Sequence, residues 1–426
     1  MLFAEEFLHY VWKQRRFPQT HLIDCQGQTL NIIQPGLVNL DSGPDFSNAK
    51  IQIGETLWAG NVEIHIKSSD WQRHNHHKDE SYDSVILHVV WENDVDVYLT
   101  NGTLIPSLTL KELIPTSLIN QYQYLKTNQN WIPCEKQITE IDSFTIQQWL
   151  QRVLVERLEF KAEAVAALSQ QLKGNWEETF YVTLTQTFGF KVNAQPFAML
   201  AQALPQQILA KHKNNTLQIE ALIFGQAGFL NDDFSDAYPS QLKVEFQFLK
   251  DKYKLRPLDK SVWKFSRLRP NNFPTIRLAQ FAALINASSH LFSKVLETNE
   301  TTSLKKLFKN IPLNNYWENH FQLDAASSPS DKTMGDKSVD ILLINAVAVV
   351  VFCYGRQTGN EKQVNAAFNL IEQIRAEENN IVTGFNALGI TAKSAFDSQA
   401  LIQLKNYYCD QKKCLSCSIG NKILNV

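Results

Sequence analysis

The chain of 426 residues has little sulfur and no long hydrophobic run. Its six cysteines are too few for a disulfide scaffold in a chain of this length. The longest apolar stretches, Ile341–Cys353 and Val85–Trp91, fall short of the roughly 18 residues that a membrane span needs. The first residues lack a basic region followed by an apolar core. We therefore expect no secretory signal, no membrane association and a cytoplasmic location.

An excess of charge of one sign is missing too, since 41 Lys and Arg oppose 43 Asp and Glu. This balance excludes a wholly basic nucleic-acid-binding chain but not a local basic patch. The charge is unevenly spread: residues 1–135 hold 9 basic and 16 acidic residues, a net of −7, and the remainder holds 32 and 27, a net of +5. Five of the ten histidines lie between His65 and His88. An acidic, histidine-rich first third predicts a part with its own role.

Hydrophobic periodicity changes along the chain in the same way. An amphipathic helix is indicated over residues 3–15, and the period of two that is typical of strands follows. From about residue 143 the period becomes 3.6. We predict an α+β protein: an α/β domain over 1–130 and a largely α-helical domain over 131–426. If the hairpin over 21–34 counts as one element of the mixed sheet, the order in the first domain is helix, three strands, helix or loop, strand. The expected strands cover residues 21–24, 30–34, 49–53, 56–67 and 85–91, and the expected helices 146–172, 177–188, 197–211, 218–225, 276–287, 340–353, 363–378 and 396–409.

The densest group of functional residue types lies in the first domain. Asp45 follows Gly43-Pro44 at a turn, and Glu63, His65 and Lys67 alternate along an expected strand, so these three share one face. Two carboxylates that meet in a cleft repel each other unless a hard cation such as Mg²⁺ or Mn²⁺ lies between them. The neighbouring His65 or Lys67 could then assist a water that attacks a phosphodiester.

This arrangement resembles the PD-(D/E)xK nuclease superfamily. Pro44-Asp45 matches the PD of its motif, and Glu63-Ile64-His65 matches the rest with histidine in place of lysine. The order helix, three strands, helix, strand is similar to the superfamily's core. The resemblance covers about residues 1–95. It implies that Asp45 and Glu63 bind the divalent metal and that His65, or Lys67 further along the face, takes the lysine's role.

Other interpretations of the same residues stay open. Asp45 could cap a turn, and the alternating row on the strand could be a solvated sheet face. The histidines could instead hold Zn²⁺ or Mn²⁺, because imidazole suits both ions. Arg73 could contact a backbone phosphate. The histidines that could hold Zn²⁺ or Mn²⁺ are His65, His74, His76, His77 and His88.

A second cluster lies near the C-terminus, where Cys409, Cys414 and Cys417 fall within nine residues. With Cys134 as a distant fourth ligand, they could bind an iron–sulfur cluster, or Zn²⁺ as the rival. Some nucleases of the superfamily carry one cysteine far upstream of a C-terminal trio that holds such a cluster, and this chain looks similar in outline. Unliganded thiols are the alternative.

A third feature is the segment 242–277, which holds 10 Lys or Arg against 3 Asp or Glu, interleaved with aromatic residues. Cations for phosphates and flat rings for bases are what a single-strand groove needs. An amphipathic helix with its rings in the core is the alternative. The candidate nucleic-acid contacts are Arg73 in the first domain and Lys264, Arg267, Arg269 and Arg277 here.

Taken whole, the chain resembles an uncharacterised bacterial family, domain of unknown function 2851. The stretches that carry this resemblance are residues 43–46, 60–65, 85–91 with His88, 263–277 and 409–420. It implies a bacterial, cytosolic protein and no particular activity.

The chemistry of the residues therefore supplies the functional prediction, a metal-dependent nuclease acting on DNA or, second, RNA. The first alternative is a non-catalytic nucleic-acid-binding or scaffold protein that keeps the nuclease fold. The second is a zinc-dependent hydrolase built on the histidines.

Overall fold

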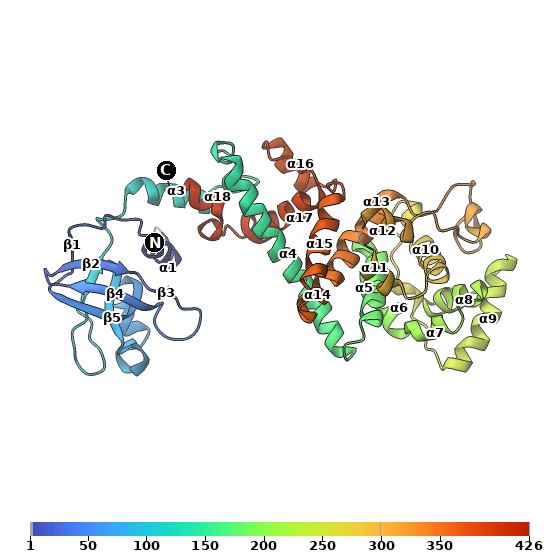
Figure 1. The fold of residues 1–426 in the computed structure, drawn as a ribbon, viewed down its shortest axis with the longest axis horizontal. Coiled ribbons are helices and arrows are strands. Elements are labelled where there is room, and N and C mark those ends of the chain that lie inside the picture. Colours follow the sequence, from blue (N-terminus) through green and yellow to red (C-terminus); the bar gives the residue numbers. More distant parts are fainter. Residues whose placement is uncertain (1–2, 299, 426) are drawn as a thin grey trace. The chain divides into compact units, whose positions relative to one another are not determined.

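The computed structural model describes residues 3–298 and 300–425, which form two compact units (Figure 1). Residues 1–149 and 405–426 make up the first unit, and residues 150–404 the second. The boundary expected from the sequence lies at 130/131, whereas here the chain through Trp149 and the tail from Lys405 belong with the first unit. The predicted α+β class, with a mixed sheet and a largely helical C-terminal part, is confirmed.

A mixed sheet forms the body of the first unit. Its strands run in the order β1-β2-β4-β5-β6-β7, with β3 paired to β4. All pairs from β1 to β5 are antiparallel, and β5-β6 and β6-β7 are parallel. The strands are β1 Leu22–Ile23, β2 Thr29–Gln34, β3 Leu37–Val38, β4 Phe46–Ile53, β5 Thr56–Lys67, β6 Val85–Glu92 and β7 Ser107–Thr109.

The second half of β5 and most of β6 are buried on both faces. Every residue from Val62 to Ile66 is buried in β5, and β6 keeps an apolar run between two parallel neighbours. Such a run is typical of a strand covered on both sides. Glu63 and His65, the polar residues in this buried half of β5, are therefore inside the unit and not on its solvent-exposed surface.

Helix α1 (Glu5–Lys13) packs its apolar side into the first unit. Phe7, Leu8, Val11 and Trp12 are fully buried, and the Trp12 indole nitrogen donates to the carbonyl of Pro35 over 3.0 Å. Its acidic first turn suits the positive end of the helix dipole. The polar side of α1 is left to face the site described below.

Short helices complete the first unit. Between β5 and β6 the chain makes three turns, and after β7 it becomes helical before entering the long helix α4. These elements are α2 Asp70–Arg73, η1 His76–Lys78, η2 Glu80–Tyr82, α3 Thr116–Thr127, η3 Ile138–Glu140, α4 Ser143–Gln171, η8 Leu404–Cys409, η9 Cys414–Ser416 and α18 Ser418–Ile423.

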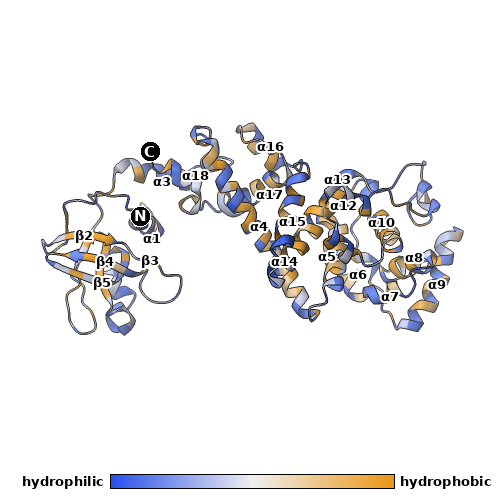
Figure 2. Cartoon of the chain, viewed as in Figure 1, coloured by the Kyte–Doolittle hydropathy of each residue, from blue (hydrophilic) through white to orange (hydrophobic). Residues whose placement is uncertain are grey.

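The second unit is helical apart from one small hairpin. Figure 2 shows hydrophobic residues concentrated on its helices around α14 and α15 and hydrophilic ones on many of the connections. The elements after α4 are α5 Trp176–Phe188, α6 Phe190–Ala203, α7 Gln206–Ala210, α8 Thr216–Gln226, α9 Ala237–Tyr253, η4 Lys260–Val262, η5 Pro270–Asn272, α10 Pro274–Ala287, α11 Leu291–Glu297, α12 Thr301–Phe308, η6 Asn315–Asn319, β8 His320–Gln322, β9 Ala325–Ala326, α13 Asp336–Leu342, η7 Leu343–Val347, α14 Ala348–Thr358, α15 Glu361–Gln373, α16 Asn380–Ala387 and α17 Ala395–Gln403.

The helices expected from the sequence are found, with differences at their ends. The single helix expected over 197–211 is two, because Pro205 lies between α6 and α7 and cannot donate a backbone hydrogen bond. Helix α9 and the short helices α11, α12 and α16 were not predicted. The helical run Asp336–Thr358 is long and apolar enough to cross a membrane, and the apolar stretch Ile341–Cys353 is its centre. Most of it is buried inside the unit, as in a core helix.

Candidate metal centre

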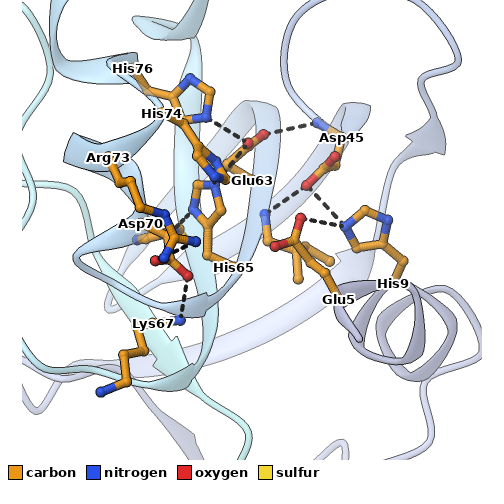
Figure 3. Close-up of polar contacts among 12 residues, drawn as sticks. Glu5, His9, Asp45, Glu63, His65, Lys67, Asp70, Arg73, His74 and His76 are labelled. Carbon is orange, nitrogen blue, oxygen red and sulfur yellow. Dashed lines mark hydrogen bonds and ion pairs between the residues drawn. The ribbon is translucent and has the colours of Figure 1, made fainter. Parts of the chain in front are cut away.

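Asp45 and Glu63 are brought together by the pairing of β4 with β5. The backbone N–H of Asp45 donates to Oε2 of Glu63 over 3.0 Å, and the backbone N–H of Ile64 donates to Oδ2 of Asp45 over 2.9 Å. The Glu63 carboxylate thus accepts from the backbone of Asp45, and the Asp45 carboxylate accepts from the backbone of the residue after Glu63 (Figure 3). The two acidic residues, 18 positions apart in sequence, share one site.

Three imidazoles gather on the far side of the Glu63 carboxylate. The ligand atoms of His65, His74 and His76 lie within 4.8 Å of one another. Oε1 of Glu63 is 3.3 Å from Nε2 of His76 and 3.5 Å from Nε2 of His65. Nε2 of His65 is in turn 3.1 Å from Nδ1 of His74. This set of three nitrogens and one oxygen has the ligand number of a tetrahedral metal site.

A left-handed residue turns the chain so that two of these histidines converge. Asn75, with φ of 65° and ψ of 20°, ends α2 and begins η1, and asparagine tolerates this conformation better than most residues. His74 and His76 flank it. The His76 ring packs against Tyr82 at 3.8 Å between centroids and against Trp71 at 5.4 Å. These contacts fix the orientation of the imidazole.

His88 supports His65 from behind. Nε2 of His88, on β6, is 2.8 Å from Nδ1 of His65, and both side chains are buried. If Nδ1 of His65 carries the proton, its Nε2 keeps a lone pair directed at His74 and Glu63. A second hydrogen bond of this kind orients metal-binding histidines in many proteins.

A second group of ligand atoms lies on the Asp45 side. Glu5, His9 and Asp45 have ligand atoms within 4.8 Å of one another. Nε2 of His9 is 3.2 Å from Oδ2 of Asp45 and 3.7 Å from Oε1 of Glu5 (Figure 3). Glu5 and His9 are one turn apart on α1, so their side chains share a face. Neither residue was predicted to belong to a site. Their spacing of four on the polar side of an amphipathic helix could have indicated that they share a face.

Burial sets the protonation of these groups. Desolvation, together with the nearby Asp45, raises the pKa of Glu63 to about 9. Desolvation and the surrounding imidazoles lower the pKa of His65 to about 2, and burial lowers that of His88 to about 3. His65 and His88 are therefore neutral at pH 7, and a neutral imidazole is the form that binds metals. A bound cation would reverse the effect on Glu63 and favour its carboxylate.

The structure distinguishes among the remaining predicted residues of the first unit. Glu63 and His65 are 5% and 1% exposed, so they do not form a solvated sheet face. The Lys67 side chain points away from the two carboxylates in Figure 3. Arg73 pairs with Oδ1 of Asp70 over 2.9 Å, and its side chain remains 66% exposed. His77 does not belong to either group of ligand atoms.

The basic segment of the second unit combines exposed cations with a buried aromatic core. Lys264, Arg267 and Arg269 are exposed. The ring of Trp263 is buried and packs on Phe197 and Phe229, so it is not available to stack on a base. The alternative of rings in the core holds for Trp263.

Arg277 differs from the other predicted contacts because it is buried at 5% exposure. Its Nη1 donates to Oε1 of Gln280 over 2.8 Å and its Nη2 to Oδ1 of Asn272 over 2.6 Å. The guanidinium lies 4.2 Å from the ring centroid of Phe190. These contacts make Arg277 a residue that holds helix α10 in place, not a surface for phosphates.

A comparison with protein families decides the assignment of the chain. A family model described as "Protein of unknown function (DUF2851)" matches residues 5–380. The chain belongs to this family. No curated protein and no solved structure matches it. The match includes both groups of ligand atoms. It ends before residues 409–420, one of the stretches on which the resemblance to this family was expected to rest.

In this DUF2851 protein the four predicted cysteines lie in the first unit, and Cys134, Cys414 and Cys417 are near enough to Cys409 to affect its pKa. Cys134, Cys414 and Cys417 are each 7% exposed. Burial raises the pKa of Cys417 to about 11 and that of Cys414 to about 12, and in Cys414 repulsion from Cys417 adds to it. Burial followed by repulsion from the other three raises the pKa of Cys409 as well. Among the described residues the cysteines form no group with ligand atoms within 4.8 Å.

Hydrogen bonds tie the C-terminal tail of the DUF2851 protein to the rest of the first unit. The Lys412 ammonium donates to the carbonyls of Lys126 and Asn128 over 2.7 and 2.9 Å. Arg16 donates to the carbonyl of Leu424 over 2.6 Å. The tail therefore docks beside the helix that precedes Cys134.

Gly60 allows β5 to approach β6 ahead of Glu63. A Cβ at this position would lie 2.4 Å from Cγ2 of Ile86 and 2.6 Å from the carbonyl oxygen of Ser84. Replacing Gly60 with Val should therefore push the strands apart and destabilise the first unit by about 1–3 kcal/mol, the usual cost of overpacking. Urea unfolding followed by circular dichroism measures the loss. Gly335→Val, at an exposed position with φ of −73° where a Cβ meets nothing within 4 Å, is the control for substitution in open space, and an equal loss in both would contradict the steric reason.

Proposed function

We propose that the first unit hydrolyses phosphodiester bonds with divalent metal ions, and that DNA is its substrate. The single observation that carries the proposal is the group of His65, His74 and His76, two of which contact the carboxylate of Glu63, next to the Glu5–His9–Asp45 group. The buried His65 and His76 lie beside the acidic groups Asp45 and Glu63 and form a possible ligand set, since buried polar and charged groups are usually paired or bind metals.

The ligand types bear on which ion is bound. Imidazole nitrogen suits Mn²⁺ and Zn²⁺, whereas Mg²⁺ prefers oxygen ligands and retains water. Of the two ions predicted from the carboxylates, Mg²⁺ and Mn²⁺, we therefore favour Mn²⁺. Zn²⁺ is the alternative ion at the histidines. Two neighbouring ions stabilise the attacking and the leaving oxygen of an in-line displacement.

The residues of the chain have separate roles in this proposal. His65, His74, His76 and Glu63 hold one ion, and Asp45, His9 and Glu5 hold the other. His88 orients His65 through the hydrogen bond between their rings. Lys67 has no part in the site, since its side chain points elsewhere (Figure 3). The histidine that replaces the lysine of the nuclease motif thus acts as a ligand.

The nuclease part of the proposal is supported by two features. The proline–aspartate and glutamate–x–histidine positions meet across β4 and β5, as the resemblance to PD-(D/E)xK nucleases implies. Helix α1 packs next to β5, which bears Glu63, and supplies two further ligand atoms. The exposed Lys264, Arg267 and Arg269 offer charges for the nucleic-acid backbone.

The test is hydrolysis of bis(4-nitrophenyl) phosphate, supercoiled plasmid and single-stranded DNA with Mn²⁺, Zn²⁺ or Mg²⁺. We expect activity with Mn²⁺ and a fall of about 100-fold or more in Glu63→Ala, since the variant loses a ligand of the proposed ion and changes even to the partners of metal ligands commonly cost about 10–100-fold. Glu55→Ala, on the exposed turn between β4 and β5, should keep full activity. If the wild type and Glu63→Ala are equally inert with every ion and substrate, the enzymatic proposal is wrong.

The same preparation tests the non-catalytic alternative. A binding module would retain salt-dependent DNA binding in Asp45→Ala and Glu63→Ala and lose it when Arg267 and Arg269 are neutralised. Arg277 is unsuitable for this test because it is buried and its loss would disturb the fold.

We propose further that Cys134, Cys409, Cys414 and Cys417 bind an iron–sulfur cluster, with Zn²⁺ as the alternative. Four cysteines near one another, three of them buried, are the observation in favour, because thiolates become stable in such a place when a metal binds them. The centre would fasten the C-terminal tail to the first unit and has no role in hydrolysis.

A further inference from the structure

The helical unit contains a cavity that the proposed function does not use. Its volume is about 910 Å³, within the range of pockets for small molecules. Helices α4, α5 and α6 and the segment from α13 through η7 to α14 line it. All of its lining residues belong to the second unit.

One wall of the cavity carries two cations. Arg157 and Lys161 are one turn apart on α4 and so share a face. Oε1 of Gln399 accepts from Nε of Arg157 over 2.5 Å and from the ammonium of Lys161 over 2.9 Å. Lys161 also donates to Oδ1 of Asn345 over 2.7 Å, and Arg157 to Oε1 of Gln403 over 3.3 Å. Within the described residues these bonds use two of the three donors of Lys161 and two of the five of Arg157.

The charge on this wall is unbalanced. Glu377 is the acidic lining residue closest to the network, and it accepts a hydrogen bond from the amide of Gln399. Two cations therefore face one carboxylate. Lys191 and Glu163 also line the cavity, and both are exposed, so their opposite charges offset each other in solvent.

The shape of the wall depends on an irregular helix. Residues Leu343–Val347 form a π-helical turn between α13 and α14, and Asn345 lies within it. Such turns often occur at functional sites because they redirect a side chain at the expense of regular hydrogen bonding. Here the turn presents Asn345 to Lys161.

The rest of the lining is largely apolar. Val165, Leu168, Phe190, Ile341 and Val349 line the cavity beside the charged wall. A cavity with hydrophobic walls and a few convergent polar groups is the usual form of a small-molecule site. The combination selects a ligand with an apolar body and one anionic end.

We propose that the cavity binds an amphipathic small molecule whose single anionic head, a carboxylate or a phosphate, contacts Arg157 and Lys161 and whose apolar body lies against Phe190 and Ile341. The two unused sets of N–H donors supply charge-assisted hydrogen bonds to the head. The apolar walls remove the body from water.

Binding should take up protons. Burial, followed by repulsion from Arg157 and opposed by Glu377, lowers the pKa of Lys161 to about 7. The other groups at this wall, Asn345 and Gln399, do not titrate. An anion favours the charged ammonium and raises its pKa, so part of a proton enters with each ligand near pH 7.5, and affinity decreases as the pH rises above 7.

The experiment is isothermal titration calorimetry of the full chain with sodium decanoate and with decyl phosphate, which distinguishes the two heads. We expect at least one of them to bind, and 1-decanol, decylamine and inorganic phosphate to bind at least ten times more weakly. The measured enthalpy should differ between HEPES and Tris at pH 7.5, because the two buffers release protons with different heats.

Matched variants locate the site. Arg157→Gln and Lys161→Met should each weaken binding by about tenfold or more, the value of a hydrogen bond to a charged group. Arg152→Gln, an exposed arginine on the same helix, should leave it unchanged. Ala164→Trp fills the cavity from an exposed lining position and should abolish binding without unfolding the unit.

The proposal would be overturned by no binding of either anion, by equal binding of decylamine, or by equal affinity in Arg152→Gln and Lys161→Met. Binding that survives Ala164→Trp would also overturn it, because the ligand would then lie elsewhere. Circular dichroism of each variant checks that it is folded. Metal-dependent hydrolysis plays no part in any of these measurements, so the two proposals can fail separately.

Discussion

Protein freed of metal should take up two Mn²⁺ ions, and His74→Ala combined with His76→Ala should reduce this to one. The two groups of ligand atoms do not share a residue, since one contains His65, His74 and His76 and the other Glu5, His9 and Asp45. Removing two of three imidazoles leaves too few ligands for tight binding, and we expect more than about a 100-fold loss of affinity at that site. Mn²⁺ prefers nitrogen and oxygen ligands to thiolates, so the cysteines do not add to the count.

Electron paramagnetic resonance of Mn²⁺ measures both the free ion and the coupling between two bound ions. The wild type should show a coupled pair, and the double variant a single uncoupled ion. His77→Ala is the matched control, because this neighbouring histidine lies in neither group. Two bound ions in the double variant, or a single one in the wild type, would contradict the arrangement.

Replacing Cys417 with Ser should remove the metal of the cysteine centre and lower the melting temperature of the first unit by about 6–12 °C. The estimate takes a loss of about 3 kcal/mol, well below the binding free energy of structural zinc sites, and the usual shift per kcal/mol in a unit of this size. Cys417 is 7% exposed and burial sets its pKa near 11, so without a metal it is a neutral thiol among other thiols.

Metal analysis of protein purified without oxygen identifies the centre. Iron with inorganic sulfide and a brown colour indicates the cluster, and stoichiometric zinc indicates the alternative. Cys25→Ser is the control, since Cys25 is exposed and far from the other cysteines in sequence. If neither iron nor zinc is present and Cys417→Ser melts like Cys25→Ser, the four thiols hold no metal.

The sequence predicted the residues that lie on strands better than those that depend on how helices pack. The period of two placed Glu63 and His65 on one face of β5, and the turn at Gly43-Pro44 placed Asp45 near them, because both are local properties of the chain. Glu5 and His9 could not be assigned to the site in this way. Their role follows from where α1 packs on the unit, which is set by tertiary contacts.

In the basic segment 242–277, the sequence likewise does not reveal which charged residues are buried. Arg277 and Arg269 are indistinguishable by type and neighbourhood in sequence, yet Arg277 is buried among polar partners and Arg269 is exposed. A charged residue on a helix is usually solvated, and only the packed structure reveals the exception. The cavity beside Arg157 and Lys161 escaped prediction for this reason as well, because its polar partners are residues 345, 377 and 399.

The tail from Lys405 returns to a unit that begins with residue 1, and 255 residues of another unit are made in between. A ribosome synthesises the chain from its first residue onward, so the opening 149 residues emerge long before the last cysteines do. The order of synthesis therefore delays closure of the first unit until the 255 residues of the second unit have been made. Fragments that end early would expose the surface around Cys134, and quality-control proteases could recognise them by it.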